Sequence, residues 1–263
     1  MKPPSIVPSL VLLLGSLAAN AAELVTLNTR TAVDQKFILI KPDKPVASVI
    51  LFAGGKGTLN LSSSIGSPRI NWGKNNFLVR SRDIFAKHGF LVAVVDAPSD
   101  RKSKTGMLGG FRNGMDHVED IDHVITHLRI QADVPVWLIG TSRGTESAAN
   151  VAMNSKQHPD GLVLTSSMSV KNSKGTALTD MDLKRITIPT LVVANNDDGC
   201  SKTPPEGAEE IARMLSNSRK VEVKMFSGGD TPISKPCQAM SYHGFLGIEE
   251  KVVESISDFI KSN

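Results

Sequence analysis

The sequence predicts one α/β domain, in which a mostly parallel, eight-stranded sheet is covered by helices on both faces. Apolar runs alternate with amphipathic segments along the chain, which is the pattern of strands joined by crossover helices. The length of 263 residues suits one large domain with a sizeable core. A glycine-rich turn of five residues joins the apolar run 135–139 to the alanine-rich segment 145–153, as in a strand–turn–helix unit.

The expected elements follow from local periodicity. Two segments near the start, 23–30 and 35–41, predict an antiparallel pair of strands. Six later apolar runs have the composition of buried strands. These runs are 47–52, 90–95, 135–139, 161–165, 189–194 and 220–226. Apolar residues at helical spacing predict helices at 77–88, 115–128, 145–153, 205–215 and 248–260.

The first 21 residues are expected to form a signal peptide rather than part of the domain. Lys2 precedes an apolar run from Ile6 to Ala19, and Ala19-Asn20-Ala21 fits the small-x-small pattern of a cleavage site. Cleavage after Ala21 would leave residues 22–263 as a single domain. The run is shorter than the about 20 apolar residues of a membrane-spanning helix, and no cysteine follows it to carry a lipid. We therefore expect a periplasmic or secreted protein without a stable membrane anchor.

Charge and histidine spacing favour neither nucleic acid nor a metal as a partner. The formal charge is +4, and loss of Lys2 with the leader lowers it to +3. Basic residues gather at 101–104 and at Arg112 without interleaved aromatic residues, which favours a solvated loop over a site for nucleic acid or an acidic substrate. His123 and His127 share a helical face, but the H-E-x-x-H pattern is absent, so surface positions are favoured over a metal site.

The turn Gly140-Thr141-Ser142-Arg143-Gly144 predicts a catalytic nucleophile. Glycines two residues before and after Ser142 permit a sharp turn that exposes the hydroxyl at the end of a strand. A hydroxyl needs a base to remove its proton and a carboxylate to orient that base. Asp198 follows the apolar run 189–194, and His243 precedes the last helix. The chain thus supplies a serine, an acid and a histidine in this order.

That order resembles the triad of the α/β-hydrolase superfamily, and more narrowly of its small dienelactone-hydrolase-like or esterase-like members. The resemblance covers about residues 36–262. It implies that Ser142 is the nucleophile, His243 the base and Asp198 the acid. Asp197 remains the alternative acid, because Asn195 stands where the family usually has a glycine and the register of the loop is open by one residue.

The resemblance also implies an oxyanion hole after the strand 47–52. The family usually has a His-Gly sequence at this turn, whereas here Ala53 precedes Gly54 and Gly55. The donors in such a site are backbone N–H groups, so this departure leaves the role intact. We assign it to the N–H groups of Gly55 and Arg143.

Two further features follow from the family topology. Cys200 lies two residues after Asp198, and Cys237 lies six residues before His243, on loops that the topology brings together. In an oxidising compartment they are expected to form a disulfide, with two buried thiols as the alternative. Only about twenty residues separate the strands on either side of Ser167 and Pro189, too few for a large lid domain. The long segments 56–74 and 99–113 are expected to border the site.

The resemblance implies a serine hydrolase acting on a small-molecule or polymeric carboxylic ester, and the expected signal peptide implies that the enzyme is exported. The resemblance implies no metal or organic cofactor. A serine peptidase or an acyltransferase would use the same residues, and a non-catalytic binding protein could keep the same fold. The sequence leaves open the acyl and alcohol groups of the substrate, the oligomeric state, and the role of the segment 76–82 beyond a helix start.

Overall fold

The computed structural model describes residues 22–64 and 66–263, so the expected leader at 1–21 lies outside the described residues. Within those ranges the chain forms one eight-stranded sheet with the strand order β1-β2-β6-β3-β7-β8-β9-β10. The strands are β1 Ala22–Arg30, β2 Val33–Ile40, β3 Ala47–Phe52, β6 Phe90–Val95, β7 Val136–Thr141, β8 Gly161–Thr165, β9 Thr190–Asn195 and β10 Val221–Phe226. A small separate hairpin pairs β4 Ser62–Ser64 with β5 Ser67–Arg69.

The sheet is mostly parallel, as predicted. Strand β2 runs antiparallel to its two neighbours β1 and β6, while every pair from β6 through β3 to β10 is parallel. Strands β3, β6, β7, β8 and β9 are buried along their whole length, because helices cover both faces of the sheet.

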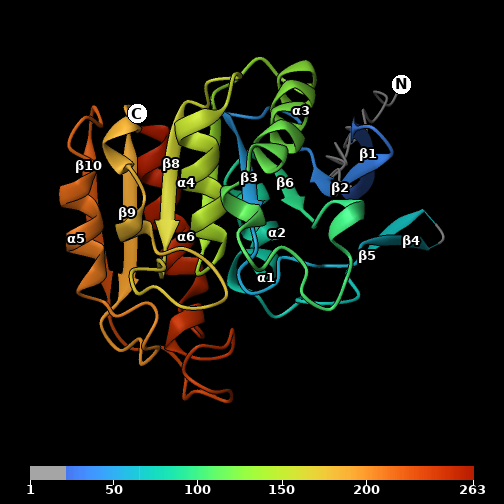
Figure 1. Cartoon of the computed structure of the whole chain (residues 1–263). Helices are drawn as coiled ribbons and strands as arrows, with labels where there is room; N and C mark the ends of the chain where they lie inside the picture. The colour runs from blue at the N-terminus through green and yellow to red at the C-terminus, as the bar shows by residue number, and fades with distance from the viewer. Residues whose placement is uncertain (1–21, 65) are drawn as a thin grey trace, which may run out of the picture.

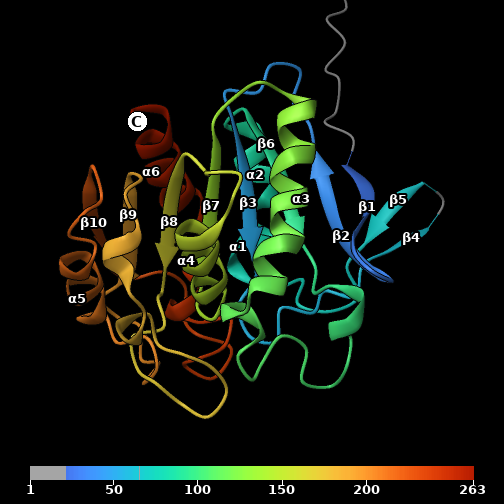
Figure 2. The same ribbon diagram turned by 45° about the horizontal axis from the view of Figure 1, so that its top comes forward.

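Helices cover the two faces in separate sets (Figures 1 and 2). Apolar residues of α1, α2 and α6 pack on one face, and those of α3, α4 and α5 pack on the other. The helices are α1 Phe77–Arg80, α2 Arg82–Lys87, α3 Met115–Gln131, α4 Gly144–Asn154, α5 Gly207–Met214 and α6 Glu249–Lys261. The single helix expected at 77–88 is instead two short helices, divided at the buried Ser81 (φ −90°, ψ 0°), whose conformation ends α1 and begins α2.

The connections leave the carboxyl ends of the parallel strands uncovered by a separate domain. Residues 166–189, between β8 and β9, contain only the short 3₁₀ turns Leu178–Asp180 and Leu183–Arg185. The expectation of no large lid domain is therefore confirmed. The loops that follow β8 and β9 gather at the lower edge of the sheet in Figure 1. In the part of the chain that the structure describes, no helix has the length and apolar character needed to cross a membrane.

Candidate active site

Ser142 lies at the sharp turn between β7 and α4. Its φ angle is +52°, a left-handed conformation that is uncommon for a residue with a side chain. The Ser142 N–H donates to the carbonyl oxygen of Thr165 (3.0 Å), and the Ser142 carbonyl oxygen accepts the N–H of Thr145 (3.0 Å). The turn is thus held both by the neighbouring strand β8 and by the first turn of α4.

Close backbone packing explains the glycines around this turn. A Cβ atom at residue 140 would lie 2.5 Å from the carbonyl oxygen of Gly144, and one at residue 144 would overlap the carbonyl oxygen of Phe52 at the end of β3. A Cβ atom on Gly54 would lie 3.0 Å from the Cβ of Ser142. The turn after β3 therefore lies directly against the turn that carries Ser142.

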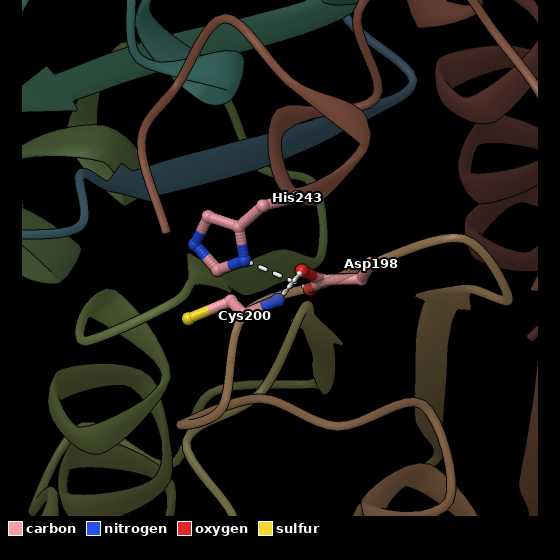
Figure 3. A group of neighbouring side chains, drawn as sticks. All are labelled: Asp198, Cys200 and His243. Atoms are coloured by element: carbon pink, nitrogen blue, oxygen red, sulfur yellow. Dashed lines mark hydrogen bonds and ion pairs between the residues drawn. The ribbon is translucent and has the colours of Figure 1, made fainter. Parts of the chain in front are cut away.

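His243 and Asp198 are joined by a hydrogen bond of 2.8 Å between the imidazole Nδ1 and the carboxylate Oδ2 (Figure 3). His243 belongs to the 3₁₀ turn Tyr242–Gly244, and Asp198 to the loop after β9. Both residues are buried. The second oxygen of Asp198, Oδ1, accepts the N–H of Cys200 at 2.9 Å. With one oxygen held by the backbone, the carboxylate presents the other to the ring.

The structure brings Asp198, rather than the alternative Asp197, to the histidine. Asp197 is exposed, and its Oδ2 accepts the N–H of Gly228 at 2.7 Å. The buried Asn195 accepts the N–H of Asp197 on Oδ1 (3.0 Å) and donates from Nδ2 to the Gly228 carbonyl oxygen (3.1 Å). The asparagine at the family's glycine position therefore orders the loop so that residue 197 faces outward and residue 198 faces inward.

Ser142 and His243 line one cavity with a volume of about 400 Å³. Leu59, Trp72 and Phe77 are among its apolar walls. Within residues 22–64 and 66–263, no hydrogen bond joins the Ser142 hydroxyl to the imidazole. The two residues share only the lining of this cavity. Residues of the segment 56–74 line this cavity, and residues of both 56–74 and 99–113 line the two cavities beside it, as expected for loops that border the site.

The two N–H groups predicted to form an oxyanion hole lie at the turns after β3 and β7. Arg143 precedes the first residue of α4, where backbone N–H groups have no partner within the helix. Gly55 has a φ of +59°, and the carbonyl oxygen of its neighbour Gly54 accepts the N–H of Gly57 (3.2 Å). Among the residues described, neither the Gly55 N–H nor the Arg143 N–H donates to another protein group. Both remain free for a bound oxygen.

Arg112 stabilises the turn after β3 through hydrogen bonds to its backbone. Its Nη2 donates to the carbonyl oxygens of Ala53 (2.9 Å) and Gly55 (3.2 Å), and its Nη1 donates to the hydroxyl of Ser147 in α4 (2.6 Å). The expectation of a solvated loop was wrong for this residue, because only 1% of Arg112 is exposed. A basic residue after a polar loop gives no sign in the sequence that it turns inward.

Two hydroxyl groups lie beside the histidine that the sequence analysis did not predict, those of Thr203 and Ser166. Thr203 places Oγ1 2.9 Å from Oδ2 of Asp198 and 3.0 Å from Nδ1 of His243, so it contacts both members of the pair. Ser166 donates its hydroxyl to the carbonyl oxygen of His243 at 2.8 Å. Neither residue lies in a recognisable motif, since each is placed by a loop that meets the histidine turn only in the folded chain.

The charged side chain next to Ser142, that of Arg143, is neutralised by an ion pair with Glu146. Arg143 pairs with Glu146 through Nη1 and Oε1 at 2.9 Å, and its other nitrogen donates to the side chain of Asn172. Burial raises the pKa of Glu146, while Arg112 and Arg143 oppose that rise. Burial also lowers the pKa of Arg112 to about 10, so its guanidinium is still charged at neutral pH.

Cys200 and Cys237 form a disulfide, the pairing expected from their loops. The Cys200 sulfur, an Asp198 oxygen and a His243 nitrogen lie within 4.8 Å of one another (Figure 3). The sulfur is bonded to Cys237 and is not a thiolate, which is the form that binds metal ions. The cluster is therefore a hydrogen-bonded pair beside a disulfide. His123 is exposed, and the ring of His127 packs edge-on against Phe37 at 5.5 Å.

Comparisons with known proteins agree with this architecture. A family model described as serine aminopeptidase, S33, matches residues 76–181. No curated protein sequence matches the chain. Three similar solved structures share 14–15% of their residues with it.

Each of the three is similar over nearly the whole chain. An esterase from Pyrococcus furiosus has a TM-score of 0.65, at 14% identity, and covers 100% of this chain and 99% of its own. A thermostable carboxyl esterase from Bacillus coagulans has a TM-score of 0.62, at 15% identity, and covers 92% and 98%. An α/β serine hydrolase without a lid, from Xanthomonas campestris, has a TM-score of 0.58, at 15% identity, and covers 94% and 97%. The strand order and these similarities show that the chain has the α/β-hydrolase fold.

Proposed function

We propose that the protein is a serine hydrolase that cleaves carboxylic esters through a covalent acyl-enzyme. One observation carries the proposal: Ser142, on its left-handed turn, lines the same cavity as His243, and Nδ1 of His243 is hydrogen-bonded to the buried carboxylate of Asp198. A nucleophile, a base and an orienting acid are the parts that acyl transfer by a hydroxyl requires.

In the proposed reaction, the hydroxyl oxygen of Ser142 attacks the ester carbonyl carbon and His243 takes up the hydroxyl proton. The bond between that carbon and the alcohol oxygen then breaks, and the histidine returns its proton to the departing oxygen. Water, deprotonated by the same histidine, attacks the acyl carbon; the bond to the Ser142 oxygen then breaks, His243 returns the proton to that oxygen, and the acid is released. Asp198 holds Nδ1 of the ring throughout, which keeps Nε2 free to exchange the proton. The absence of a bond from Ser142 to the ring is compatible with this role, because such bonds often tighten only around substrate.

The carbonyl oxygen becomes negatively charged in both steps, and the N–H groups of Gly55 and Arg143 are proposed to bind it. The support is positional: both groups lie at the two turns that Gly54 and Ser142 bring into contact, and both are free of other partners in the described residues. A preorganised donor of this kind commonly contributes about 3 kcal/mol to the stability of the transition state. Arg112 is then a positioning residue for the turn that carries one donor.

A serine peptidase is the second candidate, because the family model that matches residues 76–181 is described as a serine aminopeptidase. Peptidase or acyltransferase activity would use the same three residues and differ in the leaving group or the acceptor. A non-catalytic binding protein is the third reading, although such a protein would have no need to keep all three side chains.

The decisive experiment combines covalent labelling with a panel of substrates. A fluorophosphonate probe should label Ser142, as mapped by peptide mass spectrometry, and Ser142→Ala should abolish both labelling and ester hydrolysis with an unchanged circular dichroism spectrum. Chromogenic esters and amides with matched acyl groups then separate an esterase from a peptidase. No labelling of the folded protein would count against catalysis, and amides cleaved faster than esters would favour the peptidase.

We also propose that the protein is exported as a periplasmic or secreted enzyme. The disulfide between Cys200 and Cys237 supports this proposal, because such bonds persist in oxidising compartments. Expression of the full sequence with an N-terminal sequencing readout tests it. A mature chain that begins at Ala22 in the periplasm or medium is expected, and an uncleaved cytoplasmic chain would contradict it.

A further inference from the structure

A second cavity, with a volume of about 500 Å³, adjoins Ser142, and His243 is not among the residues that line it. It shares Ser142 and Gly55 with the first cavity, so both meet at the proposed point of attack. Its other walls come from the loops after β3, β6, β8 and β9 and from the disulfide. We call this cavity the basic pocket, after the lysines that line it.

Three lysines line the basic pocket: Lys56, Lys174 and Lys202. None of them forms an ion pair with an acidic side chain in residues 22–64 and 66–263, and no carboxylate lines the pocket in the same ranges. Arg143 also lines it, but Glu146 balances that charge through their ion pair. The pocket therefore carries about three uncompensated positive charges around one small volume. An anion that binds among these lysines would neutralise part of this positive charge.

The apolar walls of the basic pocket come from Leu108 and Met168. A ligand with both methylene groups and a negatively charged end matches this lining better than a purely aliphatic chain does. The first cavity differs, because it has only Lys56 among its charged lining residues and is bordered by Trp72 and Phe77. The two sides of Ser142 thus select for different chemistry.

The position of His243 assigns a part of the substrate to each side. The histidine must return its proton to the alcohol oxygen, so the alcohol lies within hydrogen-bonding reach of the ring. His243 lines the first cavity but not the basic pocket. The alcohol therefore belongs in the first cavity, and the acyl group belongs in the basic pocket.

We infer that the preferred substrate is an ester whose acyl group ends in a carboxylate, that is, a monoester of a dicarboxylic acid. This inference rests on the proposed function, since it names the acyl group that Ser142 would accept. Hydrolysis would release the dicarboxylate and a neutral alcohol. The carboxylate end would be attracted by Lys56, Lys174 and Lys202, while Leu108 and Met168 contact the methylene groups between the two carbonyl carbons.

The kinetic test compares two esters that differ in one charge. The p-nitrophenyl monoester of adipic acid has a terminal carboxylate, and its methyl diester lacks it. At low ionic strength, kcat/KM is expected to be at least about tenfold higher for the anionic ester, and this ratio should fall as salt screens the lysines. A third substrate, 4-acetoxybenzoate, carries its negative charge on the alcohol side and should show no such preference over its methyl ester.

Lysine variants assign the preference to the basic pocket. In the triple variant Lys56→Gln, Lys174→Gln and Lys202→Gln, the ratio of kcat/KM between the two adipate esters should fall to about one. The matched control is Lys171→Gln, on the same loop as Lys174 but paired with Asp180 and outside the pocket, and it should keep the wild-type ratio. A ratio near one in the wild type, or a ratio unchanged in the triple variant, overturns the inference.

A binding measurement separates this inference from the proposed function. Calorimetry of the Ser142→Ala variant with adipate itself needs no catalysis. Adipate should bind, and should bind at least about tenfold more weakly when the three lysines are also replaced. If adipate binds in this lysine-dependent way while no ester is cleaved, the pocket is assigned correctly and the esterase proposal fails. If esters are cleaved without charge preference and adipate does not bind, the esterase stands and the inference fails. A preference confined to 4-acetoxybenzoate would also overturn it.

Discussion

Arg80 donates a hydrogen bond of 2.5 Å from Nη2 to the carbonyl oxygen of Gly244, and so ties helix α1 to the residue that follows His243. The same guanidinium donates to the carbonyl oxygen of Ala239 (3.2 Å) and pairs with Glu249 at the start of α6 (2.7 Å). One side chain thus connects three segments around the histidine turn. This gives the segment 76–82 a role: it positions the proposed base.

Replacing Arg80 by methionine should lower kcat for ester hydrolysis by about tenfold or more, because the histidine turn loses its anchor and the ring loses its fixed orientation. Loss of these bonds should also cost about 1–3 kcal/mol of the free energy of unfolding. Arg80→Lys should restore only part of the activity, since an ammonium group cannot reproduce the planar fork. Arg82→Met is the matched control, because Arg82 donates to the nearby carbonyl oxygen of Val79 and, within the described residues, its ion pair is with the exposed Asp83. Steady-state kinetics and urea unfolding measure both effects, and equal kcat values for the two methionine variants would contradict the positioning role.

Substitutions of the two neighbouring aspartates should have very different effects. Asp198→Asn should lower kcat by about a thousandfold or more, because the amide cannot hold the ring of His243 in the required tautomer. Asp197→Asn should leave kcat within about tenfold, since that carboxylate contacts the Gly228 N–H and faces outward. Both variants keep a similar side-chain volume, so they serve as controls for each other. A larger loss in Asp197→Asn would transfer the acid role by one residue.

Much of the fold could be predicted because its signals are local. Apolar runs indicated six strands of the large sheet, two segments near the start indicated the antiparallel pair, and the spacing of apolar residues indicated the last helix. The break at Ser81 could not be predicted, because the apolar positions on either side keep one periodicity and a buried serine only interrupts it in the folded state. The small hairpin of β4 and β5 has serine-rich strands with no apolar alternation to indicate them.

The residues of the candidate site likewise fall into those that a local sequence pattern predicts and those that only the folded chain brings together. Ser142 and the glycines beside it were predictable because the turn itself requires them. The choice between Asp197 and Asp198 depended on Asn195, whose bonds to the loop are visible only in three dimensions. Thr203 acts across a separation of 40 residues, and no local pattern predicts such a contact with His243.

The disulfide should support both stability and activity, because it joins the loop of the acid to the loop of the histidine. Cys200 lies two residues from Asp198, and the bond closes a loop across a sequence separation of 37 residues. In the chain-entropy model, closing such a loop raises the free energy of unfolding by about 4 kcal/mol. Reduction, or the double variant Cys200→Ala and Cys237→Ala, should therefore lower Tm and also kcat. Thermal unfolding and kinetics with and without reductant measure the two effects, and the Ala variant, which has no bond to reduce, should not respond to reductant. An unchanged kcat after verified reduction would show that the bond does not order the site.

His117 should make the protein sensitive to acid. It lies buried in α3 between the rings of Phe52 and Phe111, and neither ring nitrogen has a hydrogen-bond partner among the described residues. Burial, together with smaller contributions from the positive charges of Arg112 and Arg30, lowers the pKa of His117 to about 3. The folded state therefore keeps this imidazole neutral at pH values where the unfolded chain, with an ordinary histidine pKa of about 6.5, binds a proton.

The sign of the effect on stability follows from that difference. Below about pH 6.5 the unfolded state binds one more proton than the folded state at this group, so the free energy of unfolding should fall as pH decreases toward 3. The slope from His117 alone is about 1.4 kcal/mol per pH unit. His117→Phe and His117→Leu remove this contribution and should flatten the dependence by about 2–3 kcal/mol between pH 6.5 and 4.5. His123→Gln, at an exposed position on the same helix, should keep the wild-type slope. Urea unfolding at several pH values provides the measurement, and identical slopes in the wild type and both His117 variants would show that the buried imidazole is not the acid-sensitive group.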